Sequence, residues 1–563
     1  MVLADVIISI LEYEGITDIF GYPGTPIMSI YHSLVHSKMV HYLSRHEQAA
    51  IFAGIGYNRI SGKIPVILVT PGPGVANIVS GLLSSHLELV PMIILTASIK
   101  NDQNYKYKIN NLSEIAAKFS KEVHHVNSLR EMLNTFSGIF GSVGDRYTVG
   151  GPFCVEICQQ LLCRSVRNSN YILKIYKIMS LSKKIRAFGK SLKISASFSG
   201  NRGFRAFIDV FNRSNRPSML IGRGCIHNGA YRVAQQISEK FKIPLVHSAP
   251  LAGTSDRNAY NFGLLGLSGD RGSYGVVEHS DLLVIIGARC HPRTIGPVEN
   301  FAPNAFIARV DVDEYKFGFD VDIRANLNIK CDSLVFCRNW LNSIGDNYTN
   351  SYTTDEISPV SQSFEITIEN GRSVNIEYFF SVLNRITGGK IPMTTGIGQN
   401  TVFAFKFYKP SDPENLILSS PDLGAMGSGL PAAIGASIAI GKKPVMVIDG
   451  DGSFQMSMQE LMTLKELALP VLIFILNNRC LGLIKENEKR MFRARPLFAG
   501  LENPDFVKLA SAFGIEGARI SSDEEVEQAL IKIFSRPRPY LLEVEISSDY
   551  TTVGNHVGEI KKL

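Results

Sequence analysis

A chain of 563 residues is too long for one hydrophobic core, and at about 150 residues per domain it predicts three or four domains. With 45% apolar and 19% charged residues the composition is that of a globular protein, and no apolar run reaches the roughly 18 residues of a membrane helix. The eight cysteines have no Cys-x-x-Cys spacing, which argues against a zinc site and a disulfide framework. The acidic start is not a secretory signal. We therefore expect a cytoplasmic protein without a membrane partner.

The net charge of +7 is concentrated in one segment. Between Arg164 and Arg205 there are 11 Lys and Arg residues and no acidic residue. No DNA- or RNA-binding motif accompanies this segment, so a solvated basic linker is favoured over a site for a polyanion. We expect no nucleic-acid partner.

In chain order, short apolar strands alternate with helical patterns, which is typical of an α/β protein whose parallel sheets are buried on both faces. The turn Thr70–Gly74 follows one strand in the first unit, and a second unit begins at Pro217. Polar or basic segments separate the units. The predicted organisation is an N-terminal domain, a basic linker, a central domain, a second linker, a C-terminal domain and a tail, at residues 1–165, 166–205, 206–343, 344–372, 373–550 and 551–563.

The first and third units repeat one another. A shift of 379 positions places Gly56 on Gly435 and Pro91 on Pro470, and the helices, strands and Gly-rich turns between them align without a gap. Two diverged copies of one fold are therefore predicted. Asp451 in the third unit falls opposite Gly72, so the two copies do not carry equivalent sites.

The stretch from Val445 to Asn478 reads as strand, Gly-Asp-Gly turn, helix and strand. A right-handed crossover makes the two strands parallel, so both end at the same edge of the sheet. Asp451 and Asn478 can then meet although they are far apart in the chain. A carboxylate and an amide oxygen beside a helix N-terminus suit Mg²⁺ carrying a diphosphate.

This pattern, GDG followed by about 25 residues and NN, resembles the signature of the thiamine-diphosphate enzymes. Nearly the whole chain is similar to the catalytic subunit of acetolactate (acetohydroxyacid) synthase. The resemblance implies three doubly wound parallel-sheet domains: pyrimidine-binding, central Rossmann-like and diphosphate-binding. It is carried by the segments FGYPGTPIMSIY, RHEQAA, LVTPGPGVANIVSGL, GARCHPRTIG, FAPNAFIARVDVD, GAMGSGLPAAIGAS, GDGSFQMSMQEL and NNRCLG.

The resemblance assigns roles to several residues. It implies that Glu47 hydrogen-bonds the pyrimidine N1′ of the cofactor, that the Gly24 backbone faces the reaction centre, and that Met426 is the wedge that bends the cofactor. As alternatives, Glu47 is an exposed first-turn acid and Met426 fills the core. Asp451, Asn478 and the backbone carbonyl of Cys480 would bind Mg²⁺. The remaining implied cofactor-binding residues are Gln399, Asn400, Gly424, Gly450, Gly452, Ser453, Leu481 and Gly482.

The central domain of such synthases binds FAD in a structural role. The positions that correspond to flavin contacts are Gly222, Gly224, Arg289, Arg293 and Asp311. A Gly-x-Gly turn alone is weak support, so an empty or nucleotide-binding domain stays an alternative.

The implied reaction is decarboxylation of pyruvate and transfer of the two-carbon unit to a second carbonyl compound. Segments that recognise the acceptor depart from the synthases at Tyr107–Ile109, at Arg289–Arg293 and at Asn487, which replaces a Trp. The acceptor therefore stays open between a 2-oxo acid and a keto-sugar. The alternatives are a 2-oxo-acid decarboxylase or aldehyde lyase on the same scaffold and a catalytically silent thiamine-diphosphate-binding subunit. In this family two subunits share each site, so a homodimer or a dimer of dimers is expected.

Overall fold

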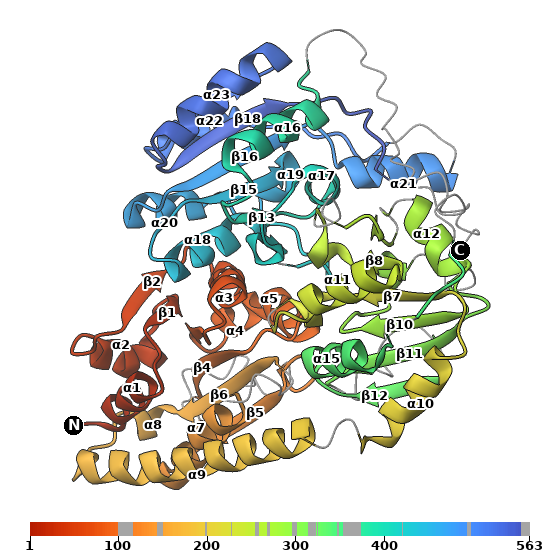
Figure 1. Ribbon diagram of the computed structural model, residues 1–563. Helices are drawn as coiled ribbons and strands as arrows, with labels where there is room; N and C mark the ends of the chain where they lie inside the picture. Colours follow the sequence, from red (N-terminus) through yellow and green to blue (C-terminus); the bar gives the residue numbers. More distant parts are fainter. Residues whose placement is uncertain are drawn as a thin grey trace.

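The computed structural model has three α/β units, each built on a six-stranded sheet, and every strand pair in these sheets is parallel (Figure 1). The prediction of three parallel-sheet α/β domains is therefore confirmed. The structure describes residues 1–98, 116–143, 150–196, 200–226, 228–253, 258–266, 269, 271–295, 301–312, 323, 325–345, 348–352, 373–418, 420–492 and 497–552.

The N-terminal sheet has the strand order β2-β1-β3-β4-β6-β5. Its strands are β1 (Asp18–Gly21), β2 (Val40–Leu43), β3 (Val66–Leu68), β4 (Met92–Ser98), β5 (Glu122–Val126) and β6 (Pro152–Cys158). Its helices are α1 (Leu3–Tyr13), α2 (Met28–Leu34), α3 (Glu47–Ser61), α4 (Pro73–Asn77), α5 (Val79–Leu87), α7 (Leu129–Val143), α8 (Gln159–Leu162) and α9 (Ser169–Ala196).

The central sheet has the order β12-β11-β10-β7-β8-β9, in which the strand order reverses about β7 as in doubly wound nucleotide-binding folds. Its strands are β7 (Pro217–Ile221), β8 (Leu245–His247), β9 (Asn261–Leu264), β10 (Leu282–Ile286), β11 (Phe306–Asp311) and β12 (Leu327–Lys330). Its helices are α10 (Arg202–Phe211), α11 (Ala230–Phe241), α12 (Arg271–Glu278), α13 (Pro292–Ile295) and α15 (Ser333–Ser343).

The C-terminal sheet has the order β14-β13-β15-β16-β18-β17. Its strands are β13 (Met393–Thr395), β14 (Leu416–Leu418), β15 (Val445–Gly450), β16 (Val471–Asn477), β17 (Glu516–Ile520) and β18 (Tyr540–Glu545). Its helices are α16 (Ile376–Thr387), α17 (Gln399–Phe407), α18 (Gly429–Ala439), α19 (Asp451–Phe454), α20 (Glu460–Leu467), α21 (Gly482–Phe492), α22 (Phe506–Ala512) and α23 (Asp523–Ser535).

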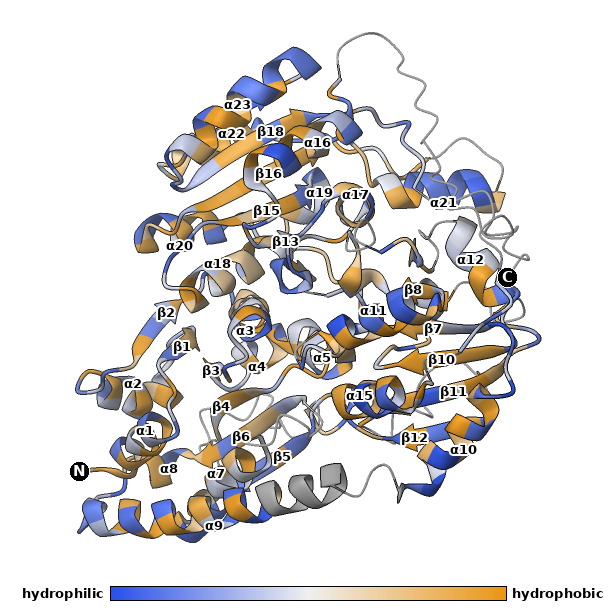
Figure 2. Ribbon diagram, in the orientation of Figure 1, coloured by the Kyte–Doolittle hydropathy of each residue, from blue (hydrophilic) through white to orange (hydrophobic). Residues whose placement is uncertain are grey.

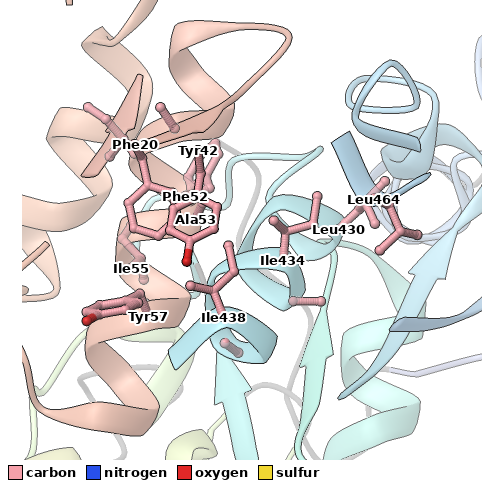
Figure 3. Close-up of a cluster of buried hydrophobic side chains, with 14 of the residues drawn as sticks. Phe20, Tyr42, Phe52, Ala53, Ile55, Tyr57, Leu430, Ile434, Ile438 and Leu464 are labelled. Atoms are coloured by element: carbon pink, nitrogen blue, oxygen red, sulfur yellow. The ribbon is translucent and has the colours of Figure 1, made fainter. Parts of the chain in front are cut away.

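The strand orders of the first and third sheets are identical once the strands are numbered within each unit, which confirms the predicted internal repeat. The two copies meet through equivalent helices, α3 and α18, whose side chains share one hydrophobic core (Figure 3). A Cβ atom on Gly56 would lie 1.9 Å from the Ala432 carbonyl oxygen, and one on Gly435 would lie 1.8 Å from that of Ala53. These contacts are related by the 379-residue shift, so the copies pack as a pseudo-symmetric pair.

The segment 166–205, predicted as a basic linker between two domains, contains a 28-residue helix. Helix α9 lies along the edge of the N-terminal domain beside α1 and α7 (Figure 1). Its inner face buries Ile172 and Tyr176 in the N-terminal core, and this apolar burial is the physical reason that it is ordered as a helix.

Residues 353–372 of the predicted second linker and 553–563 of the tail lie outside the described residues. Among the residues described, no helix is both long and apolar enough to cross a membrane.

Candidate functional site

Two strand ends form the base of the candidate site. Strands β15 and β16 are parallel neighbours, with Gly450 in register with Leu476, so Asp451 and Asn478 emerge at the same edge of the sheet. Asp451 opens the short helix α19 and is only 2% exposed. The sequence prediction that the two strands finish side by side is confirmed.

Asn503, which sequence reasoning missed, joins the two strand ends. Its Nδ2 donates to Asp451 Oδ2 at 2.6 Å and to Asn477 Oδ1 at 2.9 Å. Gln455 in turn donates from Nε2 to the Asn503 side-chain oxygen at 3.0 Å. The carboxylate is therefore fixed in orientation by an amide from a distant loop.

A second group of side chains surrounds Gln399 at the start of α17. Asn478 donates from Nδ2 to Gln399 Oε1 at 3.3 Å, while Gln399 Nε2 donates to the Tyr550 carbonyl oxygen at 2.8 Å and to Glu486 Oε2 at 3.2 Å. A Cβ atom on Gly482 would lie 1.9 Å from Gln399 Oε1, so the Gln399 side chain packs directly against this glycine. The N-termini of α17 and α21 thus approach each other beside Asn478.

The loop that carries Met426 is held over α19. Ser453 Oγ accepts the backbone N–H of Gly427 at 3.0 Å. Around Gly452, a Cβ atom would lie 2.8 Å from Leu481 Cδ2 and 3.6 Å from Met426 Cε, which places both apolar side chains beside the Gly-Asp-Gly turn. Gly424 has φ +77°, a backbone conformation that favours glycine.

Asn400 and Cys480 complete the predicted cluster. Asn400 donates from Nδ2 to the Ile448 carbonyl oxygen at 3.2 Å, and the backbone N–H of Cys480 donates to Asn478 Oδ1 at 3.1 Å. The Cys480 thiol is buried, and burial raises its pKa to about 11, so the thiol is un-ionised at neutral pH.

Burial also raises the pKa of two acids at this edge of the sheet. Desolvation raises the pKa of Asp451, although its hydrogen bond from Asn503 opposes the shift. Asp449, two positions earlier, is completely buried, and burial raises the pKa of its carboxyl to about 7. An acid at the end of an otherwise apolar strand was a usable sequence signal for Asp449.

The N-terminal copy contributes a separate group around Glu47. Glu47 is the first residue of α3, is 8% exposed, and accepts a hydrogen bond at Oε2 from Asn77 Nδ2 at 2.9 Å. A Cβ atom on Gly74 would lie 3.2 Å from Glu47 Oε1, and one on Gly24 would lie 2.5 Å from Thr70 Oγ1. Glu47 and Gly24 therefore border the same Gly-rich turn.

A cavity of about 420 Å³ opens where the three domains meet. Glu88 lies on its wall and accepts at Oε2 from Arg59 at 2.9 Å and from Arg223 at 2.8 Å, which joins the N-terminal and central domains. Arg289 pairs with Asp422 of the C-terminal domain at 3.1 Å. This size is typical of a small-molecule pocket.

Only some of the residues predicted to contact a flavin line this cavity. Gly224 and Arg289 line the cavity, whereas Gly222 and Asp311 are not among its lining residues. A Cβ atom on Gly222 would lie 2.4 Å from Ala288 Cα, so this glycine allows two strand ends to pack closely. Arg293 belongs to α13, and its side chain lies outside the described part of the structure.

Of the acceptor segments, Asn487 lies on the cavity wall, and Tyr107–Ile109 fall outside the described residues. Asn77, Glu486 and Asn503 carried no usable signal, because each meets its partner across 30 or more positions.

The donor atoms fit a cation with a diphosphate. The described residues contain no group of three or more His, Cys, Asp or Glu side chains that could hold a metal ion. A cation here would instead use one carboxylate, an amide oxygen and backbone carbonyls, which are the hard oxygens that Mg²⁺ prefers. The converging N-termini of α17 and α21 favour an anion beside it.

Comparison with known proteins also divides the chain into three domains, one for each sheet of the structure. Three family models match: the thiamine pyrophosphate enzyme N-terminal TPP binding domain at residues 1–118, the central domain at 204–337, and the C-terminal TPP binding domain at 396–544.

Relatives match along almost the whole length. The chain is 31% identical to acetolactate synthase 3 (chloroplastic) of Brassica napus, over 96% of this chain and 83% of the relative. It is 32% identical to the probable acetolactate synthase large subunit of Methanocaldococcus jannaschii, over 96% and 91%. The chain therefore belongs to the acetolactate synthase-like thiamine pyrophosphate enzymes and is a thiamine-diphosphate-dependent carboligase.

Proposed function

We propose that the enzyme decarboxylates pyruvate and joins the two-carbon unit to a second carbonyl compound, a 2-oxo acid. The observation that carries this proposal is the division of labour between the two copies. The C-terminal copy gathers Asp451, Asn478 and Gln399 at one sheet edge, and the N-terminal copy presents a buried Glu47 beside a Gly-rich turn.

In this proposal Asp451, Asn478 and the Cys480 carbonyl hold Mg²⁺, and Gln399 and the N-terminus of α17 bind the diphosphate oxygens. Asn503 keeps the Asp451 carboxylate oriented towards the metal. Met426 and Leu481 give the cofactor an apolar support beside Gly452.

Glu47 is proposed to exchange a proton with the pyrimidine ring. Bound thiamine diphosphate supplies the carbon centre that carries the two-carbon unit between the two carbonyl compounds. The Asn77 amide holds Glu47 Oε2 and leaves Oε1 on the side of Gly74. The glycine turns at Gly24 and Gly74 allow backbone N–H groups to approach a developing oxyanion.

We propose that two subunits share each site. Exposed apolar side chains flank both halves: Tyr22 and Met28 beside Gly24, and Met456 and Ile484 beside the Gly-Asp-Gly turn and α21. Their exposed fractions lie between 41% and 58%. Apolar residues exposed beside each half suit burial by another copy of the chain.

The cavity between the domains is proposed to admit the acceptor. Arg490 donates from one terminal nitrogen to Asn487 Oδ1 at 3.0 Å, while its Nε and its other terminal nitrogen are buried without a hydrogen-bond partner among the described residues. Arg490 lines the cavity, and a guanidinium on a cavity wall suits a carboxylate. This favours a 2-oxo acid over an uncharged keto-sugar.

FAD is the proposed ligand of the central-domain side of this cavity, because Gly224 and Arg289 line it. The guanidinium groups of Arg223 and Arg289 suit a diphosphate. The absorption spectrum of the purified protein tests the proposal directly. A flavin spectrum is expected, and its absence after purification without dialysis would show that the protein does not bind FAD.

Product analysis tests the reaction. The enzyme is incubated with ¹³C-labelled pyruvate, Mg²⁺ and thiamine diphosphate, first alone and then with 2-oxo-acid, aldehyde and keto-sugar acceptors. A C–C coupled acyloin from a 2-oxo acid is expected. Free acetaldehyde alone would establish the decarboxylase alternative, and cofactor binding without decarboxylation would establish a silent subunit.

A further inference from the structure

Helix α9 has two different faces, and only one is used by the fold. On the inner face, Ile172 and Tyr176 are buried. Lys184 pairs with Glu14 at 2.5 Å, and Lys183 donates to Ser137 Oγ at 2.9 Å. The helix is therefore fixed to the N-terminal domain, and its outer face is presented at the edge of the molecule (Figure 1).

The outer face carries a row of exposed apolar side chains. Tyr171, Ile178 and Ile185 follow one another at seven-residue spacing, and Leu181 lies three positions after Ile178. Their exposed fractions are 64%, 64%, 62% and 56% respectively. At 100° per residue the four positions span an arc of about 80°. We call these four residues the outer stripe.

Basic residues surround the outer stripe. Lys174 lies within its arc, Lys177 borders it on one side, and Arg186 borders it on the other, all exposed. The sequence from Arg164 to Arg205 has no acidic residue that could neutralise them. Hydrophobic and hydrophilic positions alternate along this helix in Figure 2. A binding partner must therefore offer apolar side chains together with negative charge.

Three kinds of partner can be compared for the outer stripe, and they match its apolar side chains and basic border to different degrees. A second copy of α9 would bring Lys and Arg against Lys and Arg, which is unfavourable. A membrane surface requires a broad apolar face, whereas the outer stripe is narrow and its helix is covered by protein on the other side. A narrow row with heptad spacing is typical of a coiled-coil seam, in which charges beside the seam select the partner.

We propose that the outer stripe of α9 binds an acidic amphipathic helix of another protein. In this complex the partner packs apolar side chains between Tyr171 and Ile185, and its Asp or Glu residues lie against Lys177 and Arg186. The interaction is separate from the proposed catalytic site, because α9 contributes none of the residues placed there.

A synthetic helix tests the proposal with the full-length enzyme. The probe is a fluorescein-labelled 28-residue peptide with Ile and Leu at the two seam positions of each heptad and Glu at the positions flanking them. Anisotropy is expected to show binding that weakens with added salt. A peptide of the same apolar sequence with Lys in place of Glu is expected to bind at least tenfold more weakly.

Substitutions in the outer stripe test whether the acidic peptide binds there. The double variant Ile178→Ser/Ile185→Ser is expected to lose at least tenfold in affinity for the acidic peptide, while Ile531→Ser, which removes a 52% exposed Ile from α23, leaves it unchanged. Lys177→Glu/Arg186→Glu is expected to reverse the preference towards the Lys peptide. Carboligase activity is the check that each variant is folded.

Three results would overturn the proposal. One is equal affinity of the wild type and the Ile178→Ser/Ile185→Ser variant for the acidic peptide. The second is stripe-dependent binding to phosphatidylserine vesicles without binding of the peptide, which identifies a membrane surface. The third is a change of oligomeric state in the same variant by analytical ultracentrifugation, which identifies a second copy of the chain.

Discussion

The carboxylates of Glu47 and Asp451 are each held by an amide side chain from another part of the chain. Glu47 begins a 15-residue helix and has an amide donor, Asn77, on one oxygen. Asp451 lies between strand ends with an amide donor, Asn503, on one oxygen. Each acid keeps its other oxygen for a ligand or a backbone contact, so neighbouring amides set the orientation of both groups.

Replacing the carboxyl of Glu47 tests its chemical role. Glu47→Gln keeps the size of the side chain and its acceptor oxygen for Asn77 but removes the exchangeable proton. We expect turnover to fall by about 10²- to 10⁴-fold, with binding of thiamine diphosphate and the thermal midpoint retained. Steady-state kinetics with calorimetric titration of the cofactor makes the measurement, and unchanged turnover would contradict the proposed role.

Asn503 is predicted to act through Asp451. Asn503→Ala removes both bonds that fix the strand ends, so the dissociation constants of Mg²⁺ and thiamine diphosphate should rise about 10- to 100-fold. Asn339→Ala, which removes an amide bonded to the Val335 carbonyl in α15, is the control and should leave both constants unchanged. Equal constants in wild type and Asn503→Ala would show that Asp451 needs no such support.

At the scale of elements, helices α3 and α18 hold the two copies together at glycine contacts. Because the Cβ of an alanine at position 435 would overlap the Ala53 carbonyl oxygen, Gly435→Ala must push the helices apart. We expect a clear fall in the thermal midpoint, from a cost on the order of 1–3 kcal/mol. Differential scanning calorimetry makes the comparison.

Gly275→Ala is the matched control, since a Cβ atom on this glycine of helix α12 would have no atom within 4 Å among the described residues. Alanine is the better helix former by about 1 kcal/mol, so the midpoint should stay level or rise. A similar fall of the thermal midpoint in Gly435→Ala and Gly275→Ala would argue that close packing at Gly435 is not required.

Elements also show what could be predicted from the sequence. The strand pair β15 and β16 and the repeat could be predicted, because buried parallel strands are continuous apolar runs and turns are marked by glycine. Helix α9 was not predicted, since apolar residues on both faces mask its helical period and leave only its charge visible. Asn503 and Asn77 could not be found, because only the folded chain brings them to their carboxylates.

At the scale of the whole molecule, the junction between the N- and C-terminal domains contains a buried acid. Glu460, 1% exposed in α20, accepts the backbone N–H of Arg45 at 2.8 Å, next to the helix that carries Glu47. Burial raises the pKa of its carboxyl from 4.5 to about 7, opposed by hydrogen bonds from Thr463 and the backbone. The folded chain therefore holds a proton that the unfolded chain releases.

This proton gives stability a pH dependence. Between pH 4.5 and about 7 the folded state binds more protons at Glu460 than the unfolded state, so the contribution of this group to stability falls as the pH rises. Glu460→Gln should flatten the decline of the thermal midpoint between pH 5 and pH 7.5. An unchanged slope in the variant would show that Glu460 is not protonated in the folded enzyme.

Glu47 and the Asp451–Asn478 cluster are proposed to be two halves of one site, supplied by different subunits. Glu47→Gln and Asp451→Ala subunits with different affinity tags are co-expressed, and the mixed dimer is purified through both tags. Each variant alone should be nearly inactive. The mixed dimer carries one intact site of two and should recover about half of the wild-type carboligation rate. A mixed dimer as inactive as its parents would contradict the account.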